Sequence, residues 1–230
     1  MRLFRVLVVA TSFAALLAKP SAAQEGRPFH DAWFWGVRGG VLNYSSDADW
    51  TNGPSDGTDN AGAPMVGIDW MITRTRGGLY VGIDESFFSS AAFYRRPYVT
   101  GDPAAVMRNM RRVTLAGMLF PLQRPYTHPY VGFGLALHQL GDVGLNNTIS
   151  IPALASAAQD SLMAKKVTIA PLAIVGVQQR LPGFSVFAQG SGTWLQNGFL
   201  LRNLAPKHYL QWTLEAGIRY NVGSSIDRDR

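Results

Sequence analysis

The sequence predicts an all-β fold, an eight-stranded antiparallel up-and-down transmembrane β-barrel with short turns at one end and long loops at the other. Eight segments alternate apolar and polar residues with a period of two, which gives a strand one wet face and one apolar face. The connections between them alternate strictly between short and long. The chain is 47% hydrophobic and only 16% charged, yet no segment after residue 23 has the roughly 20 apolar residues that a helical span needs.

The eight alternating segments cover residues 33–44, 63–74, 79–88, 111–122, 129–139, 166–179, 184–195 and 210–222. The last is the clearest, because every even position from Leu210 to Val222 is apolar and its length suits a tilted strand in a bilayer. Pro171 removes a ladder donor in mid-segment, so we expect a β-bulge there. Glu85 falls on the apolar face of its segment, so we expect a bulge or an early strand end near Ser86.

The short connections are residues 75–78, 123–128 and 181–183, and the long ones are 45–62, 89–110, 140–165 and 196–208. This layout is typical of outer-membrane barrels, which have short periplasmic turns and long external loops. Aromatic residues near the strand ends predict two interfacial belts. The periplasmic belt would contain Trp33, Trp35, Trp70, Phe120, Tyr130 and Tyr220, and the external belt Phe87, Trp194 and Trp212.

The chain divides into a signal peptide (1–23), a barrel domain (24–223) and a short periplasmic tail (224–230). Arg2 and Arg5 precede an apolar stretch at 7–17 and small residues at 21–23, the layout of a secretory signal peptide; an uncleaved anchor is the alternative. Cleavage would leave 18 basic and 15 acidic residues, a net charge of +3, which is no argument for nucleic-acid binding. The chain has no cysteine, which excludes disulfides and thiolate sites.

The residue composition of the polar face distinguishes a barrel in a membrane from a soluble barrel. This face is rich in glycine and alanine and sparse in lysine, as a narrow lumen requires, whereas a soluble barrel of the lipocalin kind would turn its apolar face inward. Three basic and three acidic residues on this face predict a lumen charge network, since unpaired buried charges cost several kcal/mol each. They are Arg38, Asp69, Asp84, Arg112, Glu215 and Arg219.

Two local patterns carry a family resemblance. Residues 129–136 contain a Tyr-x-Gly-x-Gly strand opening, and Glu215-x-Gly217-x-x-Tyr220-x-Val222 resembles the C-terminal insertion signal of outer-membrane barrels. It departs from that signal in having valine at the last position and a tail after it. The chain thus resembles the eight-stranded outer-membrane β-barrels of the OmpA, OmpX and opacity type. This resemblance implies a place in the Gram-negative cell envelope, with outer-membrane lipids, lipopolysaccharide and the barrel-assembly machinery as partners.

The sequence offers no catalytic, cofactor-binding or metal-binding set. His30, His128, His138 and His208 are scattered without ligand spacing. Only His138 falls on the lumen face, near the external end, where Ser191, Glu215 and Asp84 are conceivable neighbours in a lipid A-modifying enzyme; that hypothesis rests on fold analogy alone. The acidic loop at 47–59 lacks the register of an EF-hand. The loop at 141–165 could be a lid or a ligand-contacting tip.

These observations predict a non-enzymatic integral outer-membrane protein whose structural or surface-interaction role is carried by its external loops. Side chains just fill the interior of an eight-stranded barrel, which argues against a general, porin-like pore. Three alternatives stay open: a narrow channel or carrier for small hydrophobic compounds, a lipid A-modifying enzyme and, for the fold, a soluble secreted ligand-binding barrel. The sequence identifies no external ligand.

Overall fold

The computed structural model describes residues 29–46, 59–94, 105–122, 124–141, 144–145, 166–196 and 208–224, together with Asp160 and Met163. The predicted signal peptide at 1–23 and nearly all of the predicted tail lie outside the described residues, as do most of the long connections. Among the described residues, no helix is long and apolar enough to cross a membrane.

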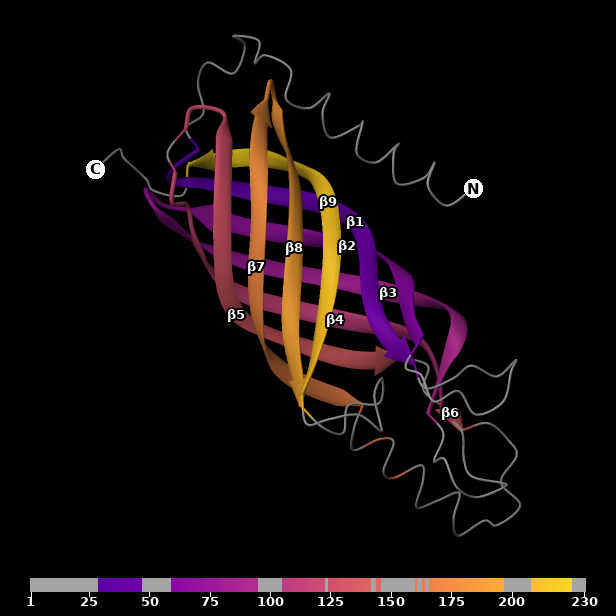
Figure 1. The fold of residues 1–230 in the computed structure, drawn as a ribbon. Helices are drawn as coiled ribbons and strands as arrows, with labels where there is room; N and C mark the ends of the chain where they lie inside the picture. Colours follow the sequence, from indigo (N-terminus) through magenta and orange to yellow (C-terminus); the bar gives the residue numbers. More distant parts are fainter. Residues whose placement is uncertain are drawn as a thin grey trace.

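Eight long strands form one closed antiparallel barrel, which confirms the predicted fold (Figure 1). Each long strand pairs with its neighbours in chain order, and β1 closes the barrel against β9. The strands are β1 (Ala32–Ser46), β2 (Asp59–Thr73), β3 (Gly77–Tyr94), β4 (Ala105–Leu119), β5 (Thr127–Gly141), β7 (Val167–Leu181), β8 (Phe184–Gln196) and β9 (His208–Ser224). The register pairs Ala32 with Ser224, so both ends of the barrel chain lie beside the three short turns. We call this the short-turn end and the opposite one the long-connection end.

The strands extend further toward the long-connection end than the alternation predicts. β2 begins at Asp59, β3 continues to Tyr94, and β4 begins at Ala105. A two-residue strand that the sequence did not predict, β6 (Gly144–Leu145), pairs with Ala105 and Val106 of β4. Backbone hydrogen bonds thus continue the hairpins past the apolar zone, where the alternating pattern fades.

The bulge expected at Pro171 is wrong. Pro171 pairs with Leu135 of β5 in an unbroken register. Toward β8 the ladder ends at the pair Leu172–Thr193, so Pro171 has no partner residue on that side. A proline is tolerated where a ladder ends, because its missing N–H interrupts no further pairing there.

Glu85 is accommodated in a different way from the one expected. β3 does not end near Ser86; its register shifts only beyond Phe87. Glu85 instead forms an ion pair with Arg111 on the neighbouring strand, with 3.3 Å between Oε2 and Nη2, and accepts a hydrogen bond from Asn109. The pair lies toward the long-connection end of the wall, where a charge can reach polar surroundings.

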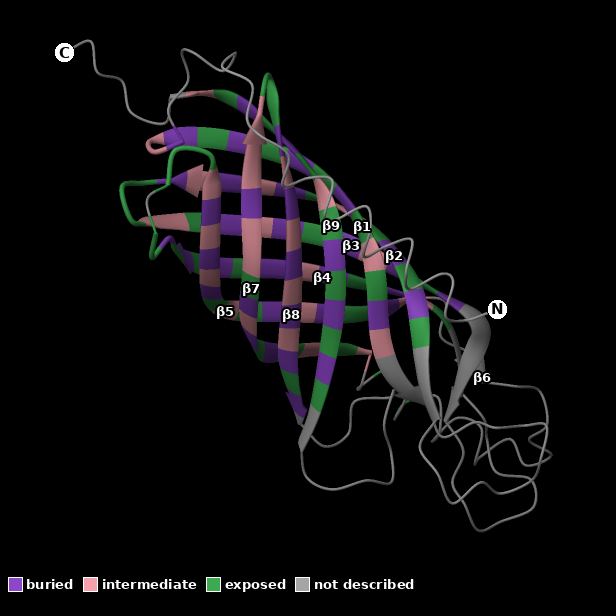
Figure 2. Cartoon of the chain, turned by 45° about the horizontal axis from the view of Figure 1, so that its top comes forward, coloured by how far each residue is buried: buried purple, intermediate pink, exposed green. Residues whose placement is uncertain are grey.

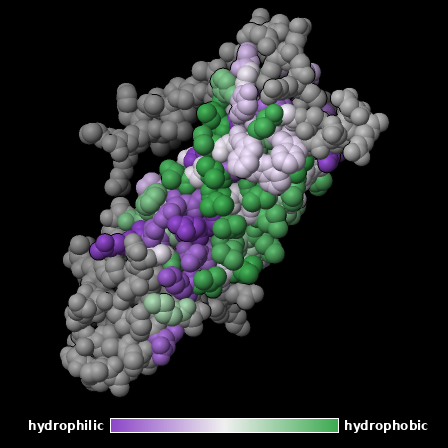
Figure 3. Space-filling view, turned by 180° about the vertical axis from the view of Figure 1, so that it is seen from behind, coloured by the Kyte–Doolittle hydropathy of each residue, from purple (hydrophilic) through white to green (hydrophobic). Residues whose placement is uncertain are grey.

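The two faces of the barrel are inverted relative to a water-soluble protein. Aliphatic side chains point outward and are exposed, as at Val37 (54%), Leu214 (60%) and Ile169 (65%), whereas six charged and four amide side chains point inward and are buried. Buried and exposed residues alternate along each strand (Figure 2), and hydrophobic residues cover a broad area of the outer wall (Figure 3). Exposed apolar surface on this scale marks a surface that meets apolar matter.

Of the nine residues predicted in the two aromatic belts, six are exposed near the strand ends and three are not. Trp33, Trp35 and Tyr220 are exposed near the short-turn end, and Phe87, Trp194 and Trp212 are exposed toward the other. Trp70 is half-buried beside Trp33. Phe120 and Tyr130 are wrongly placed in the belt, because both are buried at 1% exposure. Tyr130 lies two positions before Gly132 on β5, so both face the lumen.

Two glycines occupy positions that a residue with a side chain would strain, one in a turn and one where two strands approach closely. Gly183 takes φ +81° in the two-residue turn between β7 and β8, where Pro182 and Gly183 suit the second and third positions of a tight turn. Gly134 faces the lumen, where a Cβ atom would overlap the carbonyl oxygen of Leu115 on β4. Only glycine allows the two strands to approach this closely.

Candidate functional site

The six predicted charged residues come together in the middle of the lumen. They lie on five strands: Arg38 on β1, Asp69 on β2, Asp84 on β3, Arg112 on β4, and Glu215 and Arg219 on β9. Their side chains are no more than 3% exposed. We call these six residues the lumen charge network.

Arg38 lies at the centre of this network and contacts all three acids. Its Nη2 lies 2.7 Å from Asp84, its Nε 3.1 Å from Glu215, and its Nη1 3.5 Å from Asp69. The guanidinium therefore joins carboxylates from three different strands, β2, β3 and β9. A planar group with five N–H donors suits such a junction better than a lysine ammonium.

The other two arginines each pair with acids that Arg38 also contacts. Arg112 donates from Nε to both oxygens of Asp84 at 3.1 Å, and from Nη2 to Glu215 at 2.6 Å. Arg219 donates to Asp69 at 2.8 Å, and its guanidinium lies 3.7 Å from the ring centroid of Phe187. The six charges sum to zero and form one connected network, as buried ions require if their desolvation is to be offset.

Neutral polar residues complete the network, and among them are two tyrosines that were not predicted to belong to it. Tyr80 accepts a hydrogen bond from Arg38 through its hydroxyl group. Tyr130 donates to Gln189 at 2.8 Å, and Gln189 donates to Glu215 at 2.8 Å. Tyr80 and Tyr130 lie two positions before Gly82 and Gly132, so they occupy inward-facing positions of their strands. This alternation could have identified them from the sequence.

The short-turn end of the lumen is filled by an aromatic cluster. Phe29 precedes β1 and is 2% exposed. Its ring stacks on His128 with centroids 3.7 Å apart and an interplanar angle of 5°, and it meets Phe120 edge-on at 5.0 Å. The Thr73 hydroxyl donates to the Phe29 carbonyl group and accepts from the Ala32 N–H. Sequence periodicity gave no sign of this contact, because Phe29 lies outside any strand.

The inner wall beyond the charge network, toward the long-connection end, is mainly apolar. Its buried residues include Leu42, Met65, Met110, Leu140, Leu172 and Leu195. Gln211 lies among these strands at 1% exposure, and neither end of its amide has a hydrogen-bond partner among the described residues. This region therefore combines apolar walls with an unsatisfied amide.

Of the residues named above for lipid A modification, Asp84 and Glu215 belong to the lumen charge network, and Ser191 is hydrogen-bonded to it. The Ser191 hydroxyl lies 3.0 Å from Arg112 and 2.6 Å from the Thr213 hydroxyl, while arginines hold Asp84 and Glu215. His138 is buried on the inner face of β5, in register with Arg112. In the described part of the chain, no three His, Asp or Glu residues are grouped to hold a metal ion.

The four residues that resemble an insertion signal are divided between the faces of β9. Glu215 points into the charge network, and Gly217 lies against the backbone of β1, where a Cβ would overlap the Val37 carbonyl oxygen. Tyr220 and Val222 point outward and are 56% and 48% exposed.

Comparison with known proteins identifies solved barrels of similar topology. No protein-family model matches the chain, and no curated protein sequence matches it. The outer membrane protein OprG from Pseudomonas aeruginosa is 13% identical, with a TM-score of 0.45, over 85% of this chain and 98% of that one. Neisserial surface protein A is 11% identical, with a TM-score of 0.48, over 81% and 96%. The attachment invasion locus protein Ail of Yersinia pestis is 11% identical, with a TM-score of 0.42, over 83% and 99%. At these values, the fold assignment rests on the strand register and the burial pattern of the chain itself.

Proposed function

We propose that the chain is a non-enzymatic integral protein of the bacterial outer membrane, a closed barrel whose long connections carry its surface interactions. The inverted arrangement of its faces carries this proposal. Outward aliphatic residues are about half exposed on seven of the eight long strands, while three arginines and three acids are buried inside. In water the outward aliphatic face would be unfavourable, whereas in a bilayer it contacts lipid; the inner charges are satisfied within the barrel.

The filled lumen supports a scaffold role and argues against a general pore. The charge network occupies the middle of the barrel, and Phe29, His128 and Phe120 pack across its short-turn end. Eight strands leave just enough interior for side chains. The barrel wall then positions the long connections at one membrane surface, and rigid scaffolds commonly present functional loops in this way.

The terminal strand supports a route into the membrane. Glu215, Gly217, Tyr220 and Val222 fit the spacing of a barrel-assembly signal, and the apolar pair faces outward from the closing seam of the barrel. We infer that the barrel-assembly machinery recognises this strand before β1 closes against it. The contacts of the mature protein are then outer-membrane lipids and lipopolysaccharide.

Heat modifiability tests the membrane assignment. The protein is expressed with its leader, the outer-membrane fraction is prepared, and samples are run on a detergent gel with and without boiling. We expect the protein in this fraction, with a mobility that changes on boiling because the closed barrel resists detergent unfolding. A soluble periplasmic protein without a mobility change would contradict the proposal.

One observation favours a second candidate, a binder or carrier of small hydrophobic compounds. The inner wall beyond the charge network is mainly apolar and contains the unsatisfied amide of Gln211. An apolar compound with one polar group would suit these surroundings. Intrinsic fluorescence titrations of the detergent-folded barrel with alkanols of increasing length would test it. Saturable binding that the Leu172→Asp substitution abolishes would support this candidate. If no saturable binding is measured, the scaffold role is the better explanation.

A further inference from the structure

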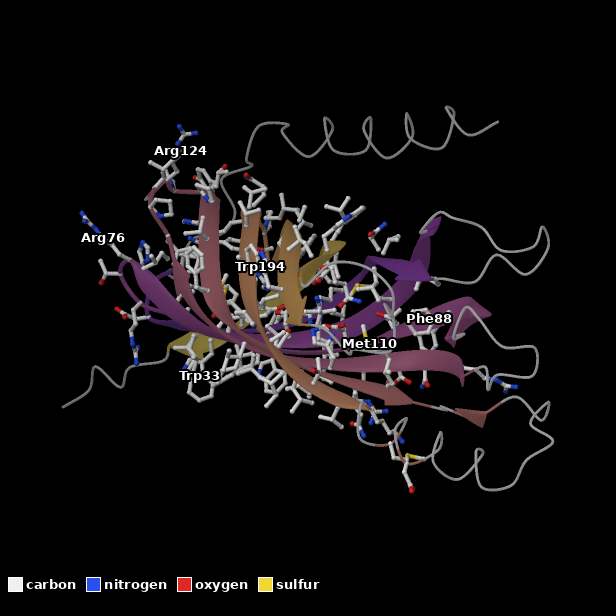
Figure 4. The ribbon with its side chains drawn as sticks, turned by 60° about the horizontal axis from the view of Figure 1, so that its bottom comes forward. Trp33, Arg76, Phe88, Met110, Arg124 and Trp194 are labelled. Atoms are coloured by element: carbon white, nitrogen blue, oxygen red, sulfur yellow. The ribbon has the colours of Figure 1, made fainter. Side chains whose placement is uncertain are left out.

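The short-turn end of the barrel carries an excess of arginine. The described residues at this end include Arg74, Arg76, Arg124 and Arg180, against one acid, Asp31. Asp31 lies 3.7 Å from Arg74. Of the described acids, none forms an ion pair with Arg76 or Arg124, and both arginines are exposed. Figure 4 shows both side chains projecting beyond the strand ends on the same side of the barrel.

The opposite end is closer to neutral in the part that the structure describes. Arg108, Arg111 and Lys166 there accompany Glu85 and Asp160, and Glu85 is paired with Arg111. The net charges are thus +3 at the short-turn end and +1 at the long-connection end, counted over these side chains. This difference is counted over the described side chains at the two ends of the barrel and is separate from the neutral network in the lumen.

Aromatic side chains place the arginine rim at the level of lipid headgroups. Trp33, Trp35, Tyr126 and Tyr220 are 38–56% exposed near the same end, and such residues concentrate where a bilayer meets water. Arginines just beyond such a belt extend their charged groups toward the headgroup layer. A guanidinium also matches phosphate geometry by donating two parallel hydrogen bonds.

We infer that Arg74, Arg76 and Arg124 form a rim that binds the anionic phosphate headgroups of phospholipids in the adjoining leaflet. The inference rests on the proposed membrane insertion. Its basis is charge complementarity between the positively charged rim and anionic headgroups, and the aromatic belt beside the rim places both at the same level. A negatively charged cell-wall polymer in the periplasm would also attract these arginines, but it would not explain the exposed aromatic side chains beside them. The rim would fix the barrel's height and favour anionic lipid around this end.

Reconstitution in vesicles tests the rim with a charge-matched control. The full chain without its leader is folded into phosphatidylcholine vesicles with or without phosphatidylglycerol. Quenching of tryptophan fluorescence by bromine-labelled lipid of each type gives the relative affinity for the anionic lipid. The test variant is R76Q/R124Q, and the control is R108Q/K166Q, which removes the same charge from the opposite end.

We expect the wild-type barrel to prefer phosphatidylglycerol at low salt and R76Q/R124Q to lose this preference, by up to about fivefold for each arginine removed. The control should keep it, and 0.5 M NaCl should remove it from the wild type, because salt screens exposed charges. Equal preferences in the two variants, or none in the wild type, would overturn the inference. Retention of the wild type on purified peptidoglycan through Arg76 and Arg124, without a lipid preference, would assign the rim to the polymer instead. Failure of every variant to insert into neutral vesicles would contradict the proposed function itself.

Discussion

Replacement of Glu215 by glutamine should destabilise the barrel strongly, because it leaves buried positive charge without compensation. Glu215 lies 2.6 Å from Arg112 and 3.1 Å from Arg38, with its side chain 1% exposed. Without it, three arginines face two acids inside the wall. Removing one partner of a buried pair costs about 3–5 kcal/mol. At a denaturant dependence of about 2 kcal/mol per molar urea, the unfolding midpoint would fall by about 2 M.

Urea unfolding of the folded barrel in vesicles, followed by tryptophan fluorescence and by the heat-dependent gel shift, measures this loss. Glu85→Gln is the matched control, since Glu85 forms a partly exposed pair with Arg111 at 3.3 Å and such pairs contribute about 0–1 kcal/mol. The double variant E215Q/R112Q restores neutrality and should lose less than the two single variants together, by about 0.5–3 kcal/mol. A loss for Glu215→Gln no larger than for Glu85→Gln would refute the charge-network reasoning.

Three further substitutions test other parts of the fold by the same unfolding measurement. Phe29→Ala removes a buried ring and should cost about 3 kcal/mol; an unchanged midpoint would show that the short-turn end does not need this ring. Gly134→Ala should cost more than about 3 kcal/mol or prevent folding, because the added Cβ meets backbone, whereas Gly190→Ala, with its nearest atom at 3.6 Å, should be nearly neutral; equal yields would show that the strands can separate. Leu214→Arg should destabilise the inserted barrel by about 2–4 kcal/mol, and a neutral result would mean that this outer position meets water.

The sequence by itself determined the strand number, the alternation of turns and loops, and the face to which each residue belongs. In an extended strand, parity alone fixes whether a side chain points inward or outward, so Arg38, Asp69 and Glu215 could be placed on one face without coordinates. The balance of three basic and three acidic residues on that face then predicted a shared network, since none can be buried alone. Parity also places Tyr130 on the inner face, so its predicted place in an aromatic belt is wrong.

Only the tertiary structure decided which residues meet across the lumen and how each end is closed. Arg112 and Glu215 are 103 positions apart in the chain, and their contact depends on the tilt and stagger of strands around a closed barrel, which period-two alternation does not encode. Phe29 lies before the first strand, so its place beneath His128 follows from the folded mouth of the barrel and from no repeat in the chain. Glu85 shows the same limit, because a charge on the apolar face is acceptable only where register brings Arg111 beside it.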